Sequence, residues 1–227
     1  SVTSIGYGAF DGCTGLTSIE IPNSVTSIGD AAFKECPNLK LVINLTTIGL
    51  SSNHITFPCK VASAPNGSRE GDFLFNNVEG VNTLCAYVGN DSEISLPTDY
   101  KGESYIIGTN AFVYDTTITS VTIPNSVTSI GESAFRGCTG LTNISIPNSV
   151  KNIDGFAFYG SGLVEAELGN GIDTLEAGTF AYCENLTKIN LPVGIIQLGL
   201  LYNNGQEGVF EGCSNLASIV IPESVTT

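Results

Sequence analysis

The chain has 227 residues, of which 42% are hydrophobic and 13% are charged, so it contains enough apolar material for a core and does not have the composition of a disordered protein. Its 22 acidic and 8 basic residues give a formal net charge of −14, which excludes nucleic acid and anionic membrane surfaces as expected partners because both require a Lys/Arg-rich face. The apolar runs fall short of the roughly 20 residues that span a bilayer, so we expect no membrane insertion by this segment.

The chain opens on a repeat. Residues 1–23 and 126–148 are the same 23-residue sequence, identical at 18 positions, with the frame S-V-T-S-I-G-x-x-A-F-x-G-C-T-G-L-T-x-I-x-I-P-N. A segment this short cannot bury its own apolar residues, so its copies must stack into a solenoid that shares one core. Aligned on the A-F and I-P landmarks, seven repeats lie at residues 1–23, 24–46, 103–125, 126–148, 149–170, 171–193 and 194–223.

Each repeat is expected to contribute one strand and one turn. The L-T-x-I-x-I-P part alternates with the period of a strand that has one buried face, and stacked copies predict a parallel sheet. The A-F-x-G-C part lies between glycines and has room for a single helical or 3₁₀ turn. A column of stacked phenylalanines is predicted opposite the sheet, made by Phe10, Phe33, Phe112, Phe135, Phe158, Phe180 and Phe210.

The landmarks L-x-x-I-x-I-P-x-x-V-x-x-I-G-x-x-A-F-x-x-C resemble the BspA-like class of leucine-rich repeats, over about three quarters of the chain. The resemblance implies an α/β fold, a right-handed leucine-rich-repeat solenoid with short helical or 3₁₀ turns opposite one parallel strand per repeat. It also implies a bacterial protein, secreted or held at the cell surface, with a role in adhesion or in binding host matrix proteins. It implies no catalytic motif, and fold transfers better than activity.

The frame breaks twice. Residues 44–102 are expected to form an irregular β-rich elaboration that rejoins the array at Ile94–Pro97, and residues 200–208 form an inserted loop that contains Tyr202. We therefore expect a single leucine-rich-repeat domain over residues 1–227. Because the chain begins and ends inside a repeat, we expect it to be part of a longer protein.

The sequence contains few groups suited to catalysis or to metal binding. His54 is the one histidine, and no phosphate-binding, dinucleotide-binding, zinc or calcium motif is present. The pair Glu165 and Glu167 is more simply a solvated acidic patch than a general acid/base pair. We therefore expect no enzyme, no cofactor and no metal.

Five of the seven cysteines recur at position 13 of their repeats, namely Cys13, Cys36, Cys138, Cys183 and Cys213. A residue that recurs at one inward position forms a ladder, and ladder neighbours have poor disulfide geometry, so we expect these thiols to be reduced. Cys59 and Cys85 are the one pair placed to form a bridge, and the sequence leaves open whether they do.

Positions 18 and 20 of the repeat point outward from the strand and form two rows on a face expected to be concave, the usual binding surface of a solenoid. Two of these residues, Leu41 and Ile43, are apolar, and we predict that the adjacent irregular segment packs over them. The candidate partner-binding residues are Ser18, Glu20, Ser120, Thr122, Asn143, Ser145, Glu165, Glu167, Lys188, Asn190 and Ser218 on the rows, with Tyr202 in the inserted loop.

Two functions remain open. The first is an extracellular, adhesin-like binding module that recognises a protein or a glycan, with a host extracellular-matrix protein as one candidate, through the rows and the two insertions. The second is a structural spacer that projects another domain from a cell surface, because the rows lack the Tyr, Trp and Arg of binding hot spots. We expect a monomer.

Overall fold

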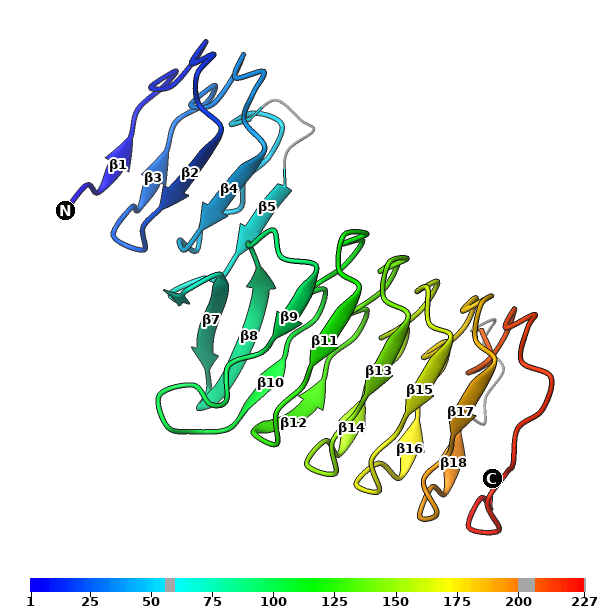
Figure 1. The fold of residues 1–227 in the computed structure, drawn as a ribbon. Coiled ribbons are helices and arrows are strands. Elements are labelled where there is room, and N and C mark those ends of the chain that lie inside the picture. Colours follow the sequence, from blue (N-terminus) through cyan, green and yellow to red (C-terminus); the bar gives the residue numbers. More distant parts are fainter. Residues whose placement is uncertain (56–59, 200–206, 227) are drawn as a thin grey trace. The chain divides into compact units, whose positions relative to one another are not determined.

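The computed structural model describes residues 1–55, 60–199 and 207–226, which fold into two compact units (Figure 1). Unit 1 comprises Ser1–Gly80 and Cys85–Gly89, and unit 2 comprises Val81–Leu84 and Asn90–Thr227. The prediction of one domain over the whole chain stays a prediction. The described residues contain strands and turns but no α-helix or 3₁₀ helix.

Parallel sheets dominate both units. In unit 1, β1 (Ser4–Ile5) pairs with β3 (Ser27–Ile28), and a second sheet has the order β2 (Ser18–Ile21), β4 (Leu41–Asn44), β5 (Lys60–Ser63). An antiparallel hairpin follows, made by β6 (Ser68–Glu70) and β7 (Phe73–Val78), and β8 (Val81–Tyr87) begins in unit 2 and ends in unit 1.

Unit 2 has two parallel sheets, each with one strand from successive repeats. The five-stranded sheet contains β9 (Glu93–Ser95), β11 (Ser120–Thr122), β13 (Asn143–Ser145), β15 (Glu165–Glu167) and β17 (Lys188–Asn190). The other sheet runs from β8 through β10 (Tyr105–Ile107), β12 (Val127–Ile130), β14 (Asn152–Ile153), β16 (Thr174–Leu175) and β18 (Gln197–Leu198). The predicted parallel-strand solenoid is thus confirmed, with one exception: residues 217–221 of the last described repeat form no strand.

The predicted helical or 3₁₀ turns are wrong, and the backbone hydrogen bonds give the reason. In the repeat 126–148, the N–H groups of Ser133, Phe135 and Gly137 donate to carbonyls of the next repeat at 2.7–3.2 Å. The alternate residues 134, 136 and 138 donate within the turn, each to the third residue back. A helix would use every N–H internally, so the stacking of repeats replaces the helix with a ladder.

This ladder requires left-handed backbone at positions 8 and 12 of the repeat, with φ between 51° and 72°. Glycine adopts this conformation at little cost, but five of the positions hold Ala, Glu, Phe or Tyr. For each of these five residues the left-handed conformation costs about 1 kcal/mol more than it does for glycine. The residues are Gly8, Ala31, Asn110, Ser133, Phe156 and Gly178 at position 8, and Gly12, Glu35, Tyr114, Gly137, Gly160, Tyr182 and Gly212 at position 12.

The phenylalanine column is confirmed within each unit. Phe10 stacks on Phe33 in unit 1 at a centroid distance of 5.4 Å, with ring planes 9° apart. In unit 2 the rings of Phe112, Phe135, Phe158, Phe180 and Phe210 stack at 4.8–5.8 Å with planes 2–11° apart. Rings in this spacing fill the interior side of every turn, so each repeat positions the next.

The cysteine ladder is also present, and its thiols join the repeats. The Sγ atoms of Cys36, Cys138, Cys183 and Cys213 each donate to the carbonyl of the phenylalanine in the preceding repeat, at 3.0–3.1 Å. Cys13, Cys36, Cys183 and Cys213 are free thiols, as predicted. Burial raises the pKa of Cys183 to about 11, so this thiol stays protonated and unreactive at neutral pH. The proposed bridge between Cys59 and Cys85 involves a residue outside the described ones.

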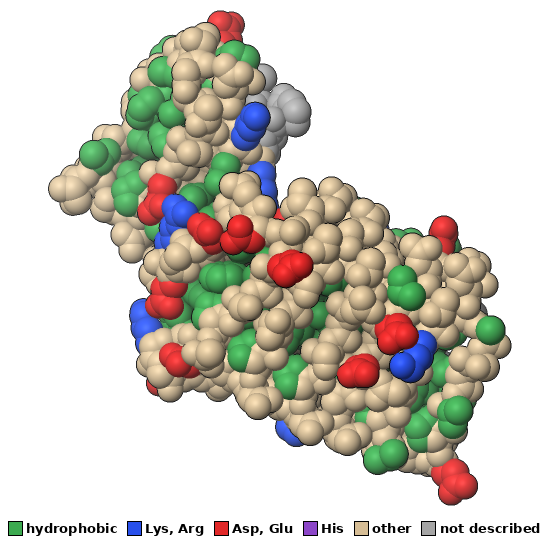
Figure 2. Space-filling model, viewed as in Figure 1, with side chains coloured by type: hydrophobic (Ala, Val, Ile, Leu, Met, Phe, Trp, Pro, Cys, Tyr) green, Lys and Arg blue, Asp and Glu red, His purple; other side chains and the backbone are tan. Residues whose placement is uncertain are grey.

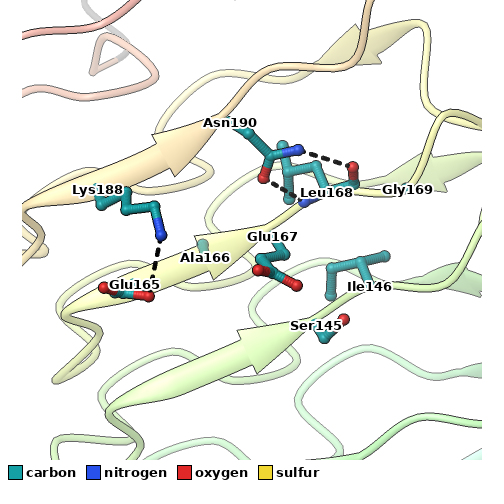
Figure 3. Close-up of a pocket in the computed structure, with 9 residues that line it drawn as sticks. All are labelled: Ser145, Ile146, Glu165, Ala166, Glu167, Leu168, Gly169, Lys188 and Asn190. Atoms are coloured by element: carbon teal, nitrogen blue, oxygen red, sulfur yellow. Dashed lines mark hydrogen bonds and ion pairs between the residues drawn. The ribbon is translucent and has the colours of Figure 1, made fainter.

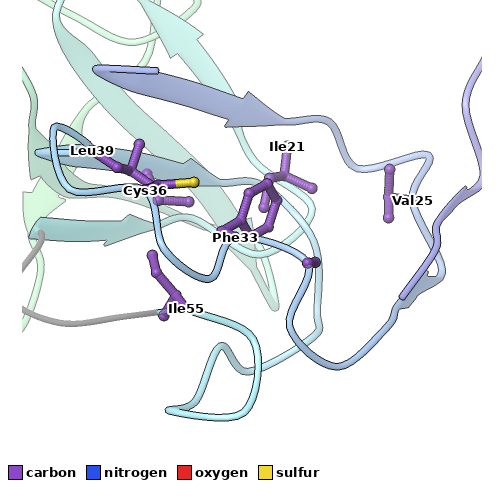
Figure 4. Packing of buried hydrophobic residues seen from close by; sticks show 8 residues of the cluster. Ile21, Val25, Phe33, Cys36, Leu39 and Ile55 are labelled. Carbon is purple, nitrogen blue, oxygen red and sulfur yellow. The ribbon is translucent and has the colours of Figure 1, made fainter. Parts of the chain in front are cut away.

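Unit 1 contains a shortened repeat that the sequence frame does not reveal. Phe33 forms a parallel bridge with Ile55, so isoleucine takes the place of the next phenylalanine. Val61 then pairs with Val42 in the sheet. Ile55 joins the interior of unit 1 with Ile21, Val25, Phe33, Cys36 and Leu39 (Figure 4), and Val61 packs against this cluster. Between residues 45 and 63 the repeat is therefore present in the structure, although its residues no longer match the repeat landmarks.

A second core lies on the outward face of β4. Ile43 is 4% exposed and packs with Ala62, Leu74, Ala86 and Val88, and Leu41 packs at the edge of the same cluster. Val42, between them, faces the first core. The prediction that the irregular segment covers Leu41 and Ile43 is confirmed.

Candidate functional site

Two rows of outward side chains cross the five-stranded sheet of unit 2. The residue between the rows on each strand is buried, which fixes the direction of its two neighbours. The first row is Glu93, Ser120, Asn143, Glu165 and Lys188, and the second is Ser95, Thr122, Ser145, Glu167 and Asn190. Eight of the twelve predicted site residues therefore lie together on one sheet.

A depression of about 250 Å³ lies in these rows, between β13, β15 and β17 (Figure 3). Its apolar floor includes the buried Ile146 and Leu168. The polar side chains around it are Ser145, Glu165, Glu167, Lys188 and Asn190, all predicted from the sequence. A hollow with an apolar floor and a polar rim suits a ligand that has both kinds of surface.

Asn190 is held rigidly at the rim. Its Oδ1 accepts from the Leu168 N–H at 3.0 Å, and its Nδ2 donates to the Leu168 carbonyl at 3.3 Å. Both ends of the amide are thus committed to the neighbouring repeat (Figure 3). The side chain shapes the depression before any ligand arrives.

Gly169 closes the end of the depression by a close backbone approach. A Cβ atom at this position would lie 2.6 Å from the carbonyl carbon of Pro147, which real side chains do not tolerate. Most repeats have proline here, as in I-P-N, whereas this one has L-G-N. With glycine here, the two repeats can approach closely, and no proline ring projects into the depression.

Charged side chains are concentrated around the depression. Figure 2 shows acidic and basic side chains over β15 and β17, on a face that is otherwise mostly uncharged. Lys188 Nζ lies 3.4 Å from Glu165 Oε2, in a pair whose side chains are 66% and 47% exposed. An exposed pair of this kind contributes at most about 1 kcal/mol and can exchange its partner for a ligand. Among the described contacts, the carboxylate of Glu167 makes no hydrogen bond or ion pair, and this residue is exposed at the end of β15.

The corresponding face in unit 1 is different. Ser18 and Glu20 lie on β2, which belongs to unit 1. Arg69, in the hairpin, reaches Glu20 at 3.4 Å and Asp72 at 3.2 Å. The irregular segment therefore contacts one candidate residue directly and buries the neighbouring strand.

Two further candidates stand apart. Ser218 is exposed but belongs to residues that form no strand, so it does not extend the paired rows. Tyr202, with most of the inserted loop at residues 200–208, lies outside the described residues. Conversely, Glu93 and Ser95 extend the rows, and the E-I-S-L-P sequence that places them on β9 matches the strand landmark.

No chemistry-bearing cluster appears in the part of the chain that the structure describes. No group of three or more His, Cys, Asp or Glu residues there could hold a metal ion. His54 makes a local turn, with its Nδ1 3.0 Å from Ser51 Oγ and accepting from the Ser51 N–H at 3.2 Å. The described residues form no helix that is long and apolar enough to cross a membrane.

A comparison with protein families agrees with the repeat landmarks, the cysteine ladder and the parallel sheets. The model of the BspA type leucine rich repeat region matches residues 1–70 and 105–227, in 6 copies. The chain belongs to the BspA-type leucine-rich-repeat family. Proteins built from this repeat are generally non-catalytic. No curated protein sequence matches the chain.

Solved structures of bacterial leucine-rich-repeat proteins resemble it. A leucine-rich repeat protein from Eubacterium ventriosum is 20% identical over 98% of this chain and 77% of its own length, with a TM-score of 0.55, a likeness that shows the fold alone. The T. pallidum leucine rich repeat protein is 25% identical over 95% of this chain and 72% of its own, with a TM-score of 0.44. A leucine rich cell surface protein from Faecalibacterium prausnitzii is 24% identical, covering 83% and 51%, with a TM-score of 0.48.

Proposed function

We propose that the chain is an extracellular, adhesin-like binding module that recognises a protein or a glycan through the sheet face of unit 2. The observation that supports this most strongly is the depression in the rows, with its apolar floor and its rim of Ser145, Glu165, Glu167, Lys188 and Asn190. Polar groups of both charge signs beside an apolar floor suit a ligand rich in hydroxyl or amide groups, such as a sugar residue or a peptide backbone.

The contrast between the units supports the same assignment. The irregular segment occupies the outward face of β4 and pairs with Glu20, so unit 1 has less open sheet surface than unit 2. We therefore assign recognition to unit 2 and a structural role to the part of the irregular segment that packs on β4. Family membership and the cell-surface description of one similar protein favour a secreted or surface location.

A spacer that projects another domain is the alternative function. One observation favours it: the rows of unit 2 contain only small or charged side chains, without the Tyr, Trp and Arg of most hot spots. A spacer needs no ligand, so this alternative expects no specific binding by either face.

Binding arrays with a matched pair of variants distinguish these functions. The chain would be applied to a glycan array and to immobilised extracellular-matrix proteins, and each hit titrated for its Kd. The triple variant Glu165→Ala/Glu167→Ala/Lys188→Ala removes charged rim groups, and we expect it to weaken binding at least about tenfold. The control Ser120→Ala/Thr122→Ala alters the same rows outside the depression and is expected to change Kd less than about twofold.

The outcomes separate cleanly. A hit that the triple variant weakens and the control does not supports the sheet face. Equal loss in both variants, or none in either, would refute the depression as the site. No hit above background for the wild-type chain would support the spacer.

A further inference from the structure

Unit 2 has a second notable surface, on the turns rather than on the sheet. Five side chains from positions 8, 11 and 12 of successive repeats form it, and we name it the turn-edge patch: Tyr114, Arg136, Phe156, Tyr159 and Tyr182. Tyr114 is 65% exposed and Tyr182 is 39% exposed, and the other three are partly exposed. Large aromatic side chains left at the surface in a contiguous group are typical of interaction sites.

Direct side-chain contacts join four of the five members, and the Tyr114 N–H donates to the Arg136 carbonyl at 2.7 Å. The Arg136 guanidinium carbon lies 4.5 Å from the centre of the Tyr159 ring. Tyr159 lies 5.8 Å from Phe156 and 5.2 Å from Tyr182, with ring planes tilted by 58° and 50°. Tilted arrangements of this kind are favourable for aromatic pairs, so the three rings stabilise one another.

Close packing over glycines holds three of these rings in place. A Cβ atom at Gly137 would overlap the Tyr114 ring, and one at Gly212 would lie 2.7 Å from Tyr182 Cδ1. Phe156 covers Gly178 in the same way. Tyr114, Phe156 and Tyr182 are also fixed by left-handed backbone, so the rings are presented with little remaining freedom.

A carboxylate contacts the patch at Tyr182. Next to Tyr182, Glu211 Oε1 accepts from the tyrosine hydroxyl at 3.2 Å, and Glu211 and Glu207 raise the Tyr182 pKa through their charge. Two residues before Phe156 in the chain, the pKa of Asp154 is raised by burial and by the charges of Glu176 and Glu132. The patch therefore has a carboxylate, Glu211, in direct contact with one of its rings.

We propose that the turn-edge patch is an interaction surface for a polypeptide segment that contains arginine or lysine side chains. A cation gains from the face of a tyrosine ring and from nearby carboxylates together, and Arg136 on Tyr159 already makes that contact within the chain. Unit 2 as a whole has 15 acidic and four basic side chains, which favours cationic partners at longer range. The proposal concerns a different surface from the sheet face and does not depend on the proposed function.

The probe is a fluorescein-labelled decapeptide of alternating glycine and arginine, titrated with the full chain at 0.15 M salt and followed by anisotropy. The same peptide with citrulline in place of arginine keeps the shape without the charge. We expect the arginine peptide to bind and the citrulline peptide to bind at least about fivefold more weakly. Fluorescent maltohexaose serves as the glycan probe.

Variants then locate the site. Tyr114→Ala/Tyr182→Ala should weaken peptide binding at least about fivefold, whereas Tyr182→Phe, which keeps the ring, should change it less than about twofold. Tyr7→Ala removes an exposed tyrosine of unit 1 and should have no effect. Circular dichroism and thermal melting would establish that each variant is folded.

Three results would overturn the proposal. Unchanged peptide affinity in Tyr114→Ala/Tyr182→Ala would mean that binding reflects diffuse negative charge. Equal binding of the arginine and citrulline peptides, or none of either, would exclude a cationic site. Binding of maltohexaose that the double variant abolishes, without peptide binding, would make the patch a glycan surface instead. The sheet-face triple variant should bind the peptide like the wild type.

Discussion

The outward faces of β4 in unit 1 and of β11 to β17 in unit 2 occupy the same place in the repeat but have opposite fates. Leu41 and Ile43 lie under the irregular segment, in a second core. Their equivalents in unit 2, such as Ser120 and Thr122, are exposed. The inward residues of both units are apolar, so they do not explain the difference. The two faces differ at positions 18 and 20 of the repeat, which are apolar where the sheet face is covered and polar where it is open.

The largest effect should come from placing a charge on the covered face. Ile43→Asp removes a buried side chain and buries a carboxylate without a partner, so we expect a loss of about 3–5 kcal/mol in the free energy of unfolding. Thr122→Asp, at the same strand position in unit 2, should change it by less than about 0.5 kcal/mol. Urea denaturation followed by circular dichroism measures both, and equal losses would contradict the contrast.

A methyl group at Gly169 tests the tight end of the open face. Gly169→Ala forces a Cβ atom against the Pro147 carbonyl, and we expect a loss of about 2 kcal/mol. Gly15→Ala in unit 1 has open space around the new methyl group and should be close to neutral. Thermal melting of both variants is the measurement, and an unchanged midpoint for Gly169→Ala would show that the repeats can move apart there.

Removal of Arg69 tests the ionic contact between the hairpin and β2. Both of its ion pairs are partly exposed, at 3.2 and 3.4 Å, so Arg69→Ala should cost only about 0.5–1 kcal/mol. The loss should shrink as salt rises from 0.05 to about 1 M, because screening weakens exposed pairs. A salt-independent loss in denaturation experiments would instead indicate packing of the arginine stem.

The smallest effect should come from the acidic turns of unit 2. Burial, Glu176 and Glu132 raise the pKa of Asp154 above its ordinary value of 3.8. The pKa of Asp154 is higher in the folded chain than in the unfolded one. Its contribution to the free energy of unfolding is therefore most favourable at a pH below 3.8, and it is lost as the pH rises through the raised pKa of the folded chain. Asp154→Asn should therefore stabilise the chain by about 0.5 kcal/mol at pH 7, with no gain below about pH 3.

Melting temperatures across that pH range check this prediction. Asp173→Asn, which changes an exposed carboxylate of the same unit, is the control. A gain of equal size at pH 3 and pH 7 would show that charge at Asp154 is not the cause.

Much of this architecture follows from the repeat itself. The strand alternation, the phenylalanine column and the thiol ladder depend on inward positions, and those hold the same residue types in most repeats. The outward rows also follow, because a buried residue between two outward ones fixes their direction. Five of the residues around the depression were therefore predictable.

Other features depend on contacts between repeats and leave little trace in a single one. Phe156 and Tyr182 adopt left-handed backbone that their own side chains disfavour, because hydrogen bonds to the next repeat at 2.6–3.1 Å compensate. The shortened repeat with Ile55 and the close approach at Gly169 likewise appear only once neighbours are stacked. The turn-edge patch was missed because its aromatic residues stand at positions 8, 11 and 12, where most repeats have a residue that is not aromatic.

Thiol labelling tests the contrast between the faces most directly. Ile43→Cys and Ser145→Cys place a thiol at the same strand position in unit 1 and unit 2, and mass spectrometry of peptides after maleimide treatment at pH 7.5 separates them from the native cysteines. We predict that the thiol introduced at position 145 reacts at the rate of an exposed thiol, and that the one at position 43 reacts at least about 100-fold more slowly, through local opening. Equal rates at the two positions would contradict the account.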